Sequence, residues 1–318
     1  MVVSIGIYRP EQFRRLRTNT FFGRRRKFAL DLMADVDRLG SNSIKEAFIE
    51  SITDGAGVYK RTYSGRFPAF DRQILACMAS GHFPRPLRIL DVAVSDGSTS
   101  VEFFNEIAAQ ITADFQFIAT DRDAGFLILN RKASPDRRVI VSATGEIVQM
   151  VWPPFVFSGG KRDNATIFLI NTMIWPYALR CAQRLVSQWK EKAPELEVRE
   201  LVFACKPFRD LLAADSRLAF KAWNIATDWP GDPVHCIRAM NILNPSYFSE
   251  DQFNSIVRNL MANLVEGGLL AIGSNEGPES EVDGAIYRLE GGRLAELISS
   301  GAGARCRYAI KSLLTHPR

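Results

Sequence analysis

The residues best suited to chemistry lie in one short stretch, residues 87–100, which reads LRILDVAVSDGSTS. An apolar run leads into Asp91, small residues follow, and a helical pattern, VEFFNEIAAQI, comes directly afterwards. Small side chains in such a turn let the backbone approach a ligand, and the start of a helix presents unpaired N–H groups to it. The stretch therefore predicts a cofactor-binding turn between a strand and a helix.

The same turn argues against two common nucleotide sites. It does not read G-x-G-x-x-G, because Ala93 and Ser95 precede the single glycine, Gly97. A dinucleotide pyrophosphate needs a closer backbone approach than this turn offers. The chain also lacks the GxxxxGK[ST] pattern of P-loop nucleotidases. An NAD enzyme and a P-loop enzyme are both disfavoured.

A second carboxylate strengthens the prediction of a ligand site. Asp121 follows the apolar segment FQFIAT, 30 residues after Asp91. A carboxylate at the end of a second strand can accept hydrogen bonds from both hydroxyls of a ribose. A turn or helix cap is the alternative role for either aspartate. Together with the turn, the pair favours a ligand that contains a nucleoside but no pyrophosphate.

The elements around these residues follow a strand–loop–helix–strand order, which predicts a parallel sheet. Before them, residues 25–80 read as helical, with helices that end before Gly40 and Gly81. After them the apolar spacing predicts further elements. These are a helix over 124–131, a hairpin over 137–152 turning at Thr144-Gly145, an apolar helix over 164–190, strands over 198–208, 218–223 and 234–237, a helix over 251–264, and strands over 269–273, 285–289 and 306–313.

Five segments in order resemble a known family. They read DVAVSDGST, ATDRD, LAFKAWNI, HCIRAMNILNPSYF and LVEGGLLAIGSNE, and they run from about Leu87 to Glu276. This pattern resembles the class I S-adenosylmethionine-dependent methyltransferases. It is most similar to the CheR-type chemotaxis-receptor methyltransferases, whose corresponding segments read SAGCSTGEE, ATDID, VxFxxxNL, FCRNVLIYF and LKPGGYLFLGHSE.

The resemblance implies an α/β fold with a Rossmann-like sheet and helices on both faces. It also implies that S-adenosyl-L-methionine is the cofactor and that a methyl group passes to an unidentified acceptor, most readily a carboxylate or another oxygen. The implied cofactor-binding residues are Asp91, Ala93, Ser95, Gly97, Asp121, Arg122, Asn224, Ile225 and Arg238.

The chain departs from the family at three places. Ala93 and Ser95 replace the first two glycines of the usual methyltransferase loop. Ser98-Thr99 replaces the family's pair of glutamates, which puts methylation of receptor glutamates in doubt. The interval from Asp121 to Asn224 is long for a minimal methyltransferase.

We therefore expect two domains, a basic arm and helical region over 1–85 and a methyltransferase-like domain over 86–318. An insertion at about 137–196 is interpreted as a lid specific for a substrate or partner.

No general base is assigned from the sequence. A carboxylate acceptor needs none, because the methyl group of a sulfonium is already activated. His235, expected at the carboxyl end of a strand, is a candidate base, with a structural histidine as the alternative. Arg238 fits either a clamp for an anionic group or a structural salt bridge.

Composition and charge limit the setting. The 318 residues are 47% hydrophobic and 24% charged, which excludes a disordered or collagen-like chain. The five cysteines form no CxxC pair and the three histidines lie far apart, so we expect no metal and a reducing, cytoplasmic compartment. No secretion signal is visible.

Two segments could contact a partner. Residues 1–28 carry eight Lys or Arg and one acid, Glu11, which suits a protein, a nucleic acid or an anionic membrane surface. The apolar segment within 164–190 is too short to span a bilayer and suits a buried or partner-binding helix. A non-catalytic binding module, or an enzyme peripheral to the membrane that acts on a lipid-linked acceptor, is therefore the alternative function.

Overall fold

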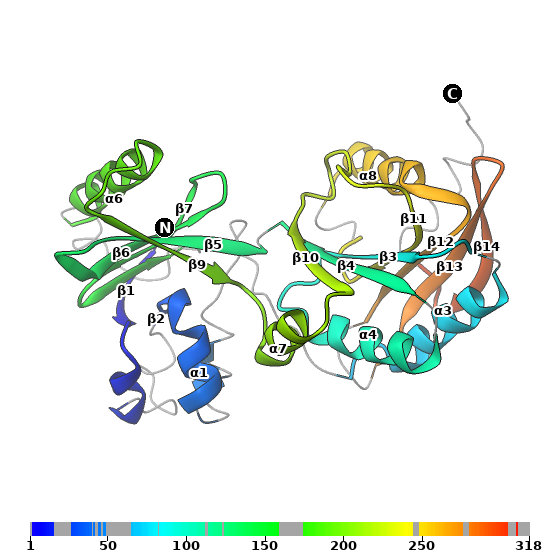
Figure 1. The fold of residues 1–318 in the computed structure, drawn as a ribbon, viewed down its shortest axis with the longest axis horizontal. Helices are drawn as coiled ribbons and strands as arrows, with labels where there is room; N and C mark the ends of the chain where they lie inside the picture. Colours follow the sequence, from blue (N-terminus) through cyan, green and yellow to red (C-terminus); the bar gives the residue numbers. More distant parts are fainter. Residues whose placement is uncertain are drawn as a thin grey trace. The chain divides into compact units, whose positions relative to one another are not determined.

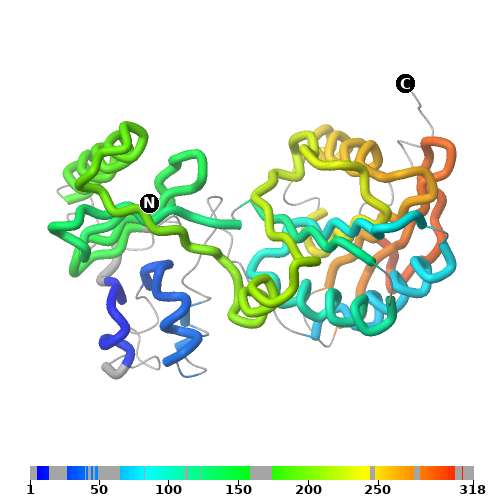
Figure 2. Tube along the Cα trace, in the orientation of Figure 1, coloured from blue at the N-terminus to red at the C-terminus, as the bar shows by residue number. Residues whose placement is uncertain are grey.

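The structure is a computed structural model, and it describes the chain in thirteen segments. These are residues 2–15, 27–39, 41, 44–45, 47–48, 65–81, 83–111, 114–122, 124–158, 174–243, 248–275, 280–304 and 310. The chain divides into two compact units. The Rossmann-like unit comprises Thr62–Ala124 and Pro207–Arg318, and the insert unit comprises Met1–Arg61 and Gly125–Lys206. Figure 2 follows the described trace through both units.

The Rossmann-like unit is built on a seven-stranded sheet in the order β10-β4-β3-β11-β12-β13-β14. Its strands are β3 (Leu87–Val92), β4 (Phe115–Asp121), β10 (Leu218–Ala222), β11 (Val234–Met240), β12 (Leu264–Ser274), β13 (Asp283–Glu290) and β14 (Arg293–Ser300). The first five in this order run parallel, and the last two pairings are antiparallel. The parallel part has the order of a Rossmann sheet, with the first strand at its centre.

Helices cover both faces of this sheet. Figure 1 shows α8 (Glu250–Ala262) on one face, and α3 (Pro68–Ser80) and α4 (Ser98–Gln110) on the other. Apolar strand residues point to both faces, which is why LRILDV reads as a continuous apolar run around its aspartate. The predicted Rossmann-like sheet with helices on both faces is confirmed. The predicted strand over 306–313 falls almost wholly outside the described residues, and β14 is the last described strand.

The insert unit has a second seven-stranded sheet in the order β2-β1-β8-β7-β6-β5-β9. Its strands are β1 (Val2–Ile7), β2 (Lys27–Phe28), β5 (Gly125–Arg131), β6 (Ser134–Ser142), β7 (Ile147–Trp152), β8 (Phe155–Ser158) and β9 (Leu196–Val202). One face packs against α6 (Trp175–Lys190), and the other packs against η2 (Leu30–Leu32) and α1 (Met33–Leu39). The 3-10 helix η1 (Pro10–Arg15) follows β1.

The predicted hairpin over 137–152 is confirmed as β6 and β7, which pair antiparallel. Gly145 sits in its turn with a φ of 87°. The predicted helix over 124–131 is wrong, because these residues form strand β5. Leu127 and Leu129 face α6 while Phe126 and Ile128 face the opposite core. A strand covered on both faces has no polar alternation, so its apolar run cannot be told from a buried helix by periodicity alone.

The division into units differs from the predicted boundary at residue 86. Strand β1 pairs with β8, so the N-terminal residues share a sheet with the inserted segment. The inserted segment itself runs over Gly125–Lys206, wider than 137–196. Residues from Thr62 onward, including α3, belong to the Rossmann-like unit. Strands β1 and β8 lie about 150 residues apart in the chain, so no local sequence pattern predicts their pairing.

The two expected partner-binding segments are described only in part. Residues 16–26 of the basic arm and 164–173 of the apolar segment lie outside the described residues. The described helix α6 buries Ala178, Ala182 and Leu185 against the insert sheet, as a sheet-covering helix does. No helix in the described part of the chain is long and apolar enough to cross a membrane.

Candidate cofactor-binding site

The site lies where three parallel strands of the Rossmann-like unit end. The register pairs Val92 of β3 with Thr120 of β4, and Asp121 of β4 with Ala222 of β10. The carboxyl ends of the three strands therefore meet at one edge of the sheet, where open α/β sheets bind ligands. The 93–97 loop, Asp121 and the 223–227 turn all lie at this edge.

Backbone hydrogen bonds hold these pieces together. The Ser95 N–H donates to Asp121 Oδ2 over 2.7 Å, and the Val94 N–H donates to the carbonyl of Thr120 over 3.0 Å. The Trp223 N–H donates to the Asp121 carbonyl over 3.0 Å. Asp121 is nearly buried, so its carboxylate is held against the loop instead of extending into solvent. The turn and the strand-end carboxylate that the sequence singles out are therefore in direct contact.

Alternate residues of the loop have positive φ values, a backbone conformation that glycine adopts most readily. Ala93, Ser95 and Gly97 have φ values of 56°, 57° and 78°. Non-glycine residues rarely adopt this left-handed region, since their Cβ approaches the following carbonyl. The chain thus keeps the shape of a glycine-rich loop although two of the glycines are replaced. Retention of a strained backbone without glycine points to a functional constraint on the loop.

Helix α4 begins directly after this loop. Asp96 Oδ1 accepts a hydrogen bond of 3.1 Å from the Ser98 N–H. The Ser98 hydroxyl oxygen is buried and has no hydrogen-bond partner among the described residues. The first turn of a helix carries partial positive charge, so this end of α4 can bind an anionic group. The orphaned hydroxyl is a donor that a ligand at the loop would satisfy.

We expect Ala93→Gly to raise the free energy of unfolding by about 0.5–1 kcal/mol. Glycine removes the left-handed penalty of about 1–2 kcal/mol but adds entropy to the unfolded chain. Chemical denaturation would measure the change. As a control, Ala109→Gly in the exposed last turn of α4 should lower stability by up to about 1 kcal/mol. If Ala93→Gly lowered the free energy of unfolding, the claim that Ala93 has a strained backbone would be wrong.

Asp91 and Arg238 have a different role from the predicted contact with a cofactor. They lie opposite each other on β3 and β11, and both are about 1% exposed. Arg238 donates from Nη1 to both Asp91 carboxylate oxygens, at 3.2 and 3.1 Å, and from Nε and Nη2 to Asp71, at 2.8 and 3.0 Å. The Ser100 hydroxyl donates to Asp91 over 2.7 Å. The network joins β3, which ends just before the loop, to α4, which begins just after it, and to α3 and β11.

Burial and mutual charge shift the pKa values of the ionisable groups in this network. Burial raises the pKa of Asp71 to about 6, although Arg238 opposes the shift. Burial disfavours the charge on Arg238, but the two aspartates together raise the pKa of its guanidinium. Of the two roles that the sequence left open for Arg238, the structure shows the structural salt bridge.

Gly97 is required by packing as well as by its backbone angle. A Cβ at this position would overlap the ring of Phe208, a buried residue of α7 (Lys206–Ala214). The Phe208 ring in turn packs edge-on against Phe220, with ring centroids 5.1 Å apart. The ring of Phe208 therefore occupies the space that a side chain at position 97 would need. Nothing in the sequence pairs Phe208 with this loop.

The remaining predicted residues are distributed along the edge. Asn224 is exposed after β10, and its Oδ1 accepts a hydrogen bond of 3.1 Å from the Ala226 N–H. Ile225 is buried in the core beside α8, so its side chain supports the turn from inside. Arg122 is exposed immediately after Asp121.

His235 is not at the expected end of its strand. It is the second residue of β11, so it lies toward the edge opposite the loop. Its Nδ1 accepts a hydrogen bond of 2.8 Å from the Arg88 N–H, and burial followed by the Arg88 charge lowers its pKa. Its role is therefore structural, and it is not a base for this site.

A cluster that sequence analysis missed bounds the other half of the edge. Asn241 and Asn275 follow β11 and β12, and Asn241 Oδ1 accepts a hydrogen bond of 2.9 Å from the Asn275 N–H. Arg66 donates from Nη2 to the Asn275 carbonyl over 2.7 Å and from Nε to its side-chain oxygen over 3.0 Å. The segment before α3 is thereby fastened across the ends of these strands.

Comparisons with known proteins bear on the fold. No protein-family model matches the chain, and no curated protein matches it. Its structure is similar to that of the citrinin polyketide synthase CMeT domain, with 12% identity, 76% of this chain and 42% of that one covered, and a TM-score of 0.34. It is also similar to the N-methyltransferase NodS from Bradyrhizobium japonicum WM9 in complex with S-adenosyl-L-homocysteine, with 12% identity, 64% and 59% covered, and a TM-score of 0.28.

A third similar structure is S-adenosylmethionine-bound CalS10, an amino pentose methyltransferase from Micromonospora echinaspora. It has 10% identity, 75% of this chain and 76% of that one covered, and a TM-score of 0.28. None of these three is named as a chemotaxis-receptor methyltransferase. The chain spans less than two thirds of the length of the first two. Because all three TM-scores lie below 0.5, the assignment of the fold rests on the strand order described above.

Proposed function

We propose that the protein is a class I S-adenosylmethionine-dependent methyltransferase whose cofactor binds at the carboxyl edge of β3, β4 and β10. The observation that carries this proposal is the 93–97 loop. Its backbone has the left-handed shape of a glycine-rich loop, it is hydrogen-bonded to the Asp121 carboxylate, and it leads directly into a helix. These are the parts needed for a nucleoside ligand that carries no pyrophosphate.

The residues at this edge fit the proposed cofactor. Asp121 supplies a carboxylate that accepts hydrogen bonds from ribose hydroxyls. The start of α4, with the partnerless Ser98 hydroxyl, suits the carboxylate of the methionine part. Asn224 closes the edge on the β10 side. When bound, the cofactor supplies a methyl group that is already activated by the sulfonium.

The chain's own contribution is then to hold and orient the reactants. In-line displacement gains most of its rate from proximity and alignment, and a carboxylate acceptor needs no base. The acceptor in this proposal is a carboxylate or another oxygen. Within class I, the proposal places the protein with the CheR-type methyltransferases. The free thiols of Cys77, Cys181 and Cys236 suit the reducing cytoplasm.

The test is a calorimetric titration of the protein with S-adenosylmethionine and S-adenosylhomocysteine. Asp121→Ala should weaken binding by about ten- to a hundred-fold, since a hydrogen bond to a charged group contributes about 1.5–3 kcal/mol. The control is Asp232→Ala, which removes an exposed carboxylate just before β11, toward the opposite edge of the sheet. Equal affinities in the two variants would remove Asp121 from the site.

A screen of methyl acceptors decides whether the protein is an enzyme or a non-catalytic binding module. Transfer from S-adenosylmethionine to a carboxylate or hydroxyl compound supports the enzyme. Cofactor binding without transfer to any acceptor would favour the module.

A further inference from the structure

A separate pocket lies wholly within the insert unit, between β6, β7 and helix α6. Its volume is about 260 Å³, room for a small ring with one substituent. Its inner wall is apolar: Val139 and Met150 from the strands and Ala178, Ala182 and Leu185 from the helix are all buried. Figure 1 shows α6 lying along this sheet.

The rim of the pocket is cationic. Arg131, Arg137 and Arg184 line it from β5, β6 and α6, and no Asp or Glu is among the lining residues that the structure describes. Arg137 has the same strand parity as Val139, so it lies on the α6 face of β6. Its guanidinium stacks over the Trp152 ring at 4.5 Å from the centroid. Stacking of this kind fixes the plane of a guanidinium and directs its N–H groups outward in that plane.

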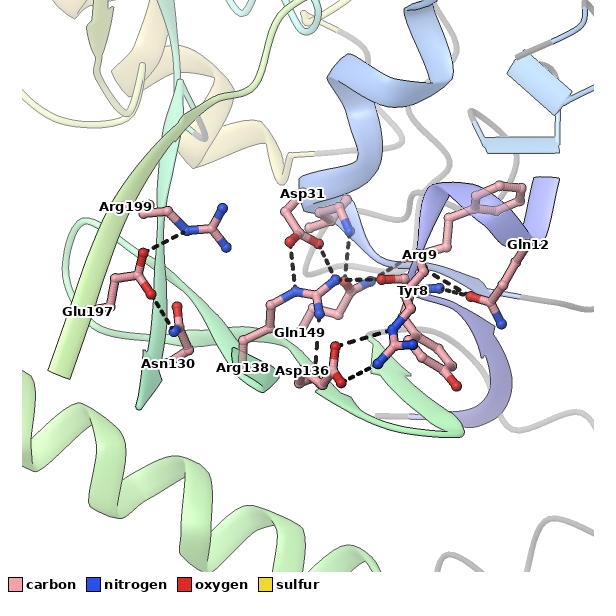
Figure 3. Close-up of polar contacts among 12 residues, drawn as sticks. Tyr8, Arg9, Gln12, Asp31, Asn130, Asp136, Arg138, Gln149, Glu197 and Arg199 are labelled. Carbon is pink, nitrogen blue, oxygen red and sulfur yellow. Dashed lines mark hydrogen bonds and ion pairs between the residues drawn. The ribbon is translucent and has the colours of Figure 1, made fainter. Parts of the chain in front are cut away.

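Three carboxylates of this unit have partners outside the pocket, as Figure 3 shows. Asp31 pairs with Arg138 on the opposite face of β6, at 2.6 Å from Nε, and Asp136 pairs with Arg9. Glu197 accepts a hydrogen bond of 2.8 Å from Asn130. Within the described ranges, neither Arg137 nor Arg184 has an ion-pair partner. The positive charge on the rim is therefore uncompensated by these residues.

We propose that this pocket, the β6–α6 pocket, binds a small molecule in which a phosphate or carboxylate adjoins an apolar ring. Arg137 and Arg184 hold the anion, because guanidinium groups match both anions in geometry and charge. The ring enters between Met150 and Ala182, and the nearby ring of Tyr177, stacked edge-on against Trp152 at 5.4 Å, borders the entrance. This binding is independent of the cofactor edge in the Rossmann-like unit.

The first test titrates the full chain with phenyl phosphate, phenylacetate, inorganic phosphate and benzyl alcohol by calorimetry. Phenyl phosphate or phenylacetate should bind at least ten-fold more tightly than inorganic phosphate and benzyl alcohol. Which of the two binds better identifies the anion. Absence of binding by both, or equal binding of neutral benzyl alcohol, would overturn the proposal.

Variants then place the anion. The double variant Arg137→Gln/Arg184→Gln should weaken binding of the better probe at least ten-fold. Arg180→Gln makes the same change one turn earlier on α6, at an exposed position outside the pocket lining, and should change affinity less than two-fold. Undiminished binding in the double variant would show that the probe binds elsewhere.

A cysteine in the pocket wall gives an independent readout in the unaltered protein. Cys181 is a half-buried free thiol that lines the pocket, and Cys205 is a half-buried cysteine outside the pocket lining. Saturating probe should slow alkylation of Cys181 several-fold and leave Cys205 unchanged, as measured by mass spectrometry of the two peptides. Equal protection of both thiols, or of neither, would contradict this location.

Discussion

Replacing Arg238 with methionine is expected to lower the free energy of unfolding by about 3–5 kcal/mol. The substitution leaves Asp71 and Asp91 buried at 2% and 1% exposure without their cation. Breaking a buried ion pair from one side costs about this much, because the remaining charges stay desolvated. Urea denaturation followed by circular dichroism would measure the loss.

Two further variants separate charge burial from lost packing. Arg217→Met removes an arginine that also pairs with a carboxylate, Asp215, but at 40% exposure. Methionine retains an apolar chain beside Phe115, so the loss should stay below about 1 kcal/mol. Adding Asp71→Asn to Arg238→Met should recover part of the stability. If Arg238→Met lowered the free energy of unfolding no more than Arg217→Met, the buried ion-pair network would not stabilise this unit.

Substituting valine for Gly97 should be the second large effect, with a loss of about 3 kcal/mol or more. A β-branched residue at a φ of 78° is strained, and its Cβ would overlap Phe208. Overpacking and backbone strain each cost about 1–3 kcal/mol. Thermal unfolding of the variant would show the effect directly.

Gly292 provides the matched control for this substitution. It has a φ of 75° in the turn between β13 and β14, and a Cβ there would meet nothing within 4 Å. Gly292→Val therefore carries the backbone strain without the overlap and should cost about 1–2 kcal/mol. Equal losses at the two glycines would mean that Phe208 yields easily and that packing does not fix the loop.

The sequence predicts the parallel sheet and its loop because their signals are local. The run LRILDV, the small residues after it and the helix VEFFNEIAAQI specify β3, the loop and α4 within 24 residues. Asp121 and Asn224 follow neighbouring parallel strands, so the sequence predicts that they share one edge of the sheet.

The errors come from contacts between residues far apart in the chain. Asp71 lies 167 residues from Arg238, so no spacing reveals that the arginine is already occupied. The sequence predicts His235 at the carboxyl end of its strand, but the strand extends five residues past it to Met240. The ring of Phe208 over Gly97 and the pairing of β1 with β8 likewise depend on the folded chain alone.

The central claim is that S-adenosylmethionine binds at the carboxyl edge of β3, β4 and β10. Hydrogen exchange measured by mass spectrometry, with and without saturating S-adenosylhomocysteine, tests it most directly. We predict slower exchange in peptides that cover residues 93–100, 121–122 and 223–227, and unchanged exchange in β6, β7 and α6. Absence of protection at the 93–100 loop, or protection confined to the insert unit, would contradict the account.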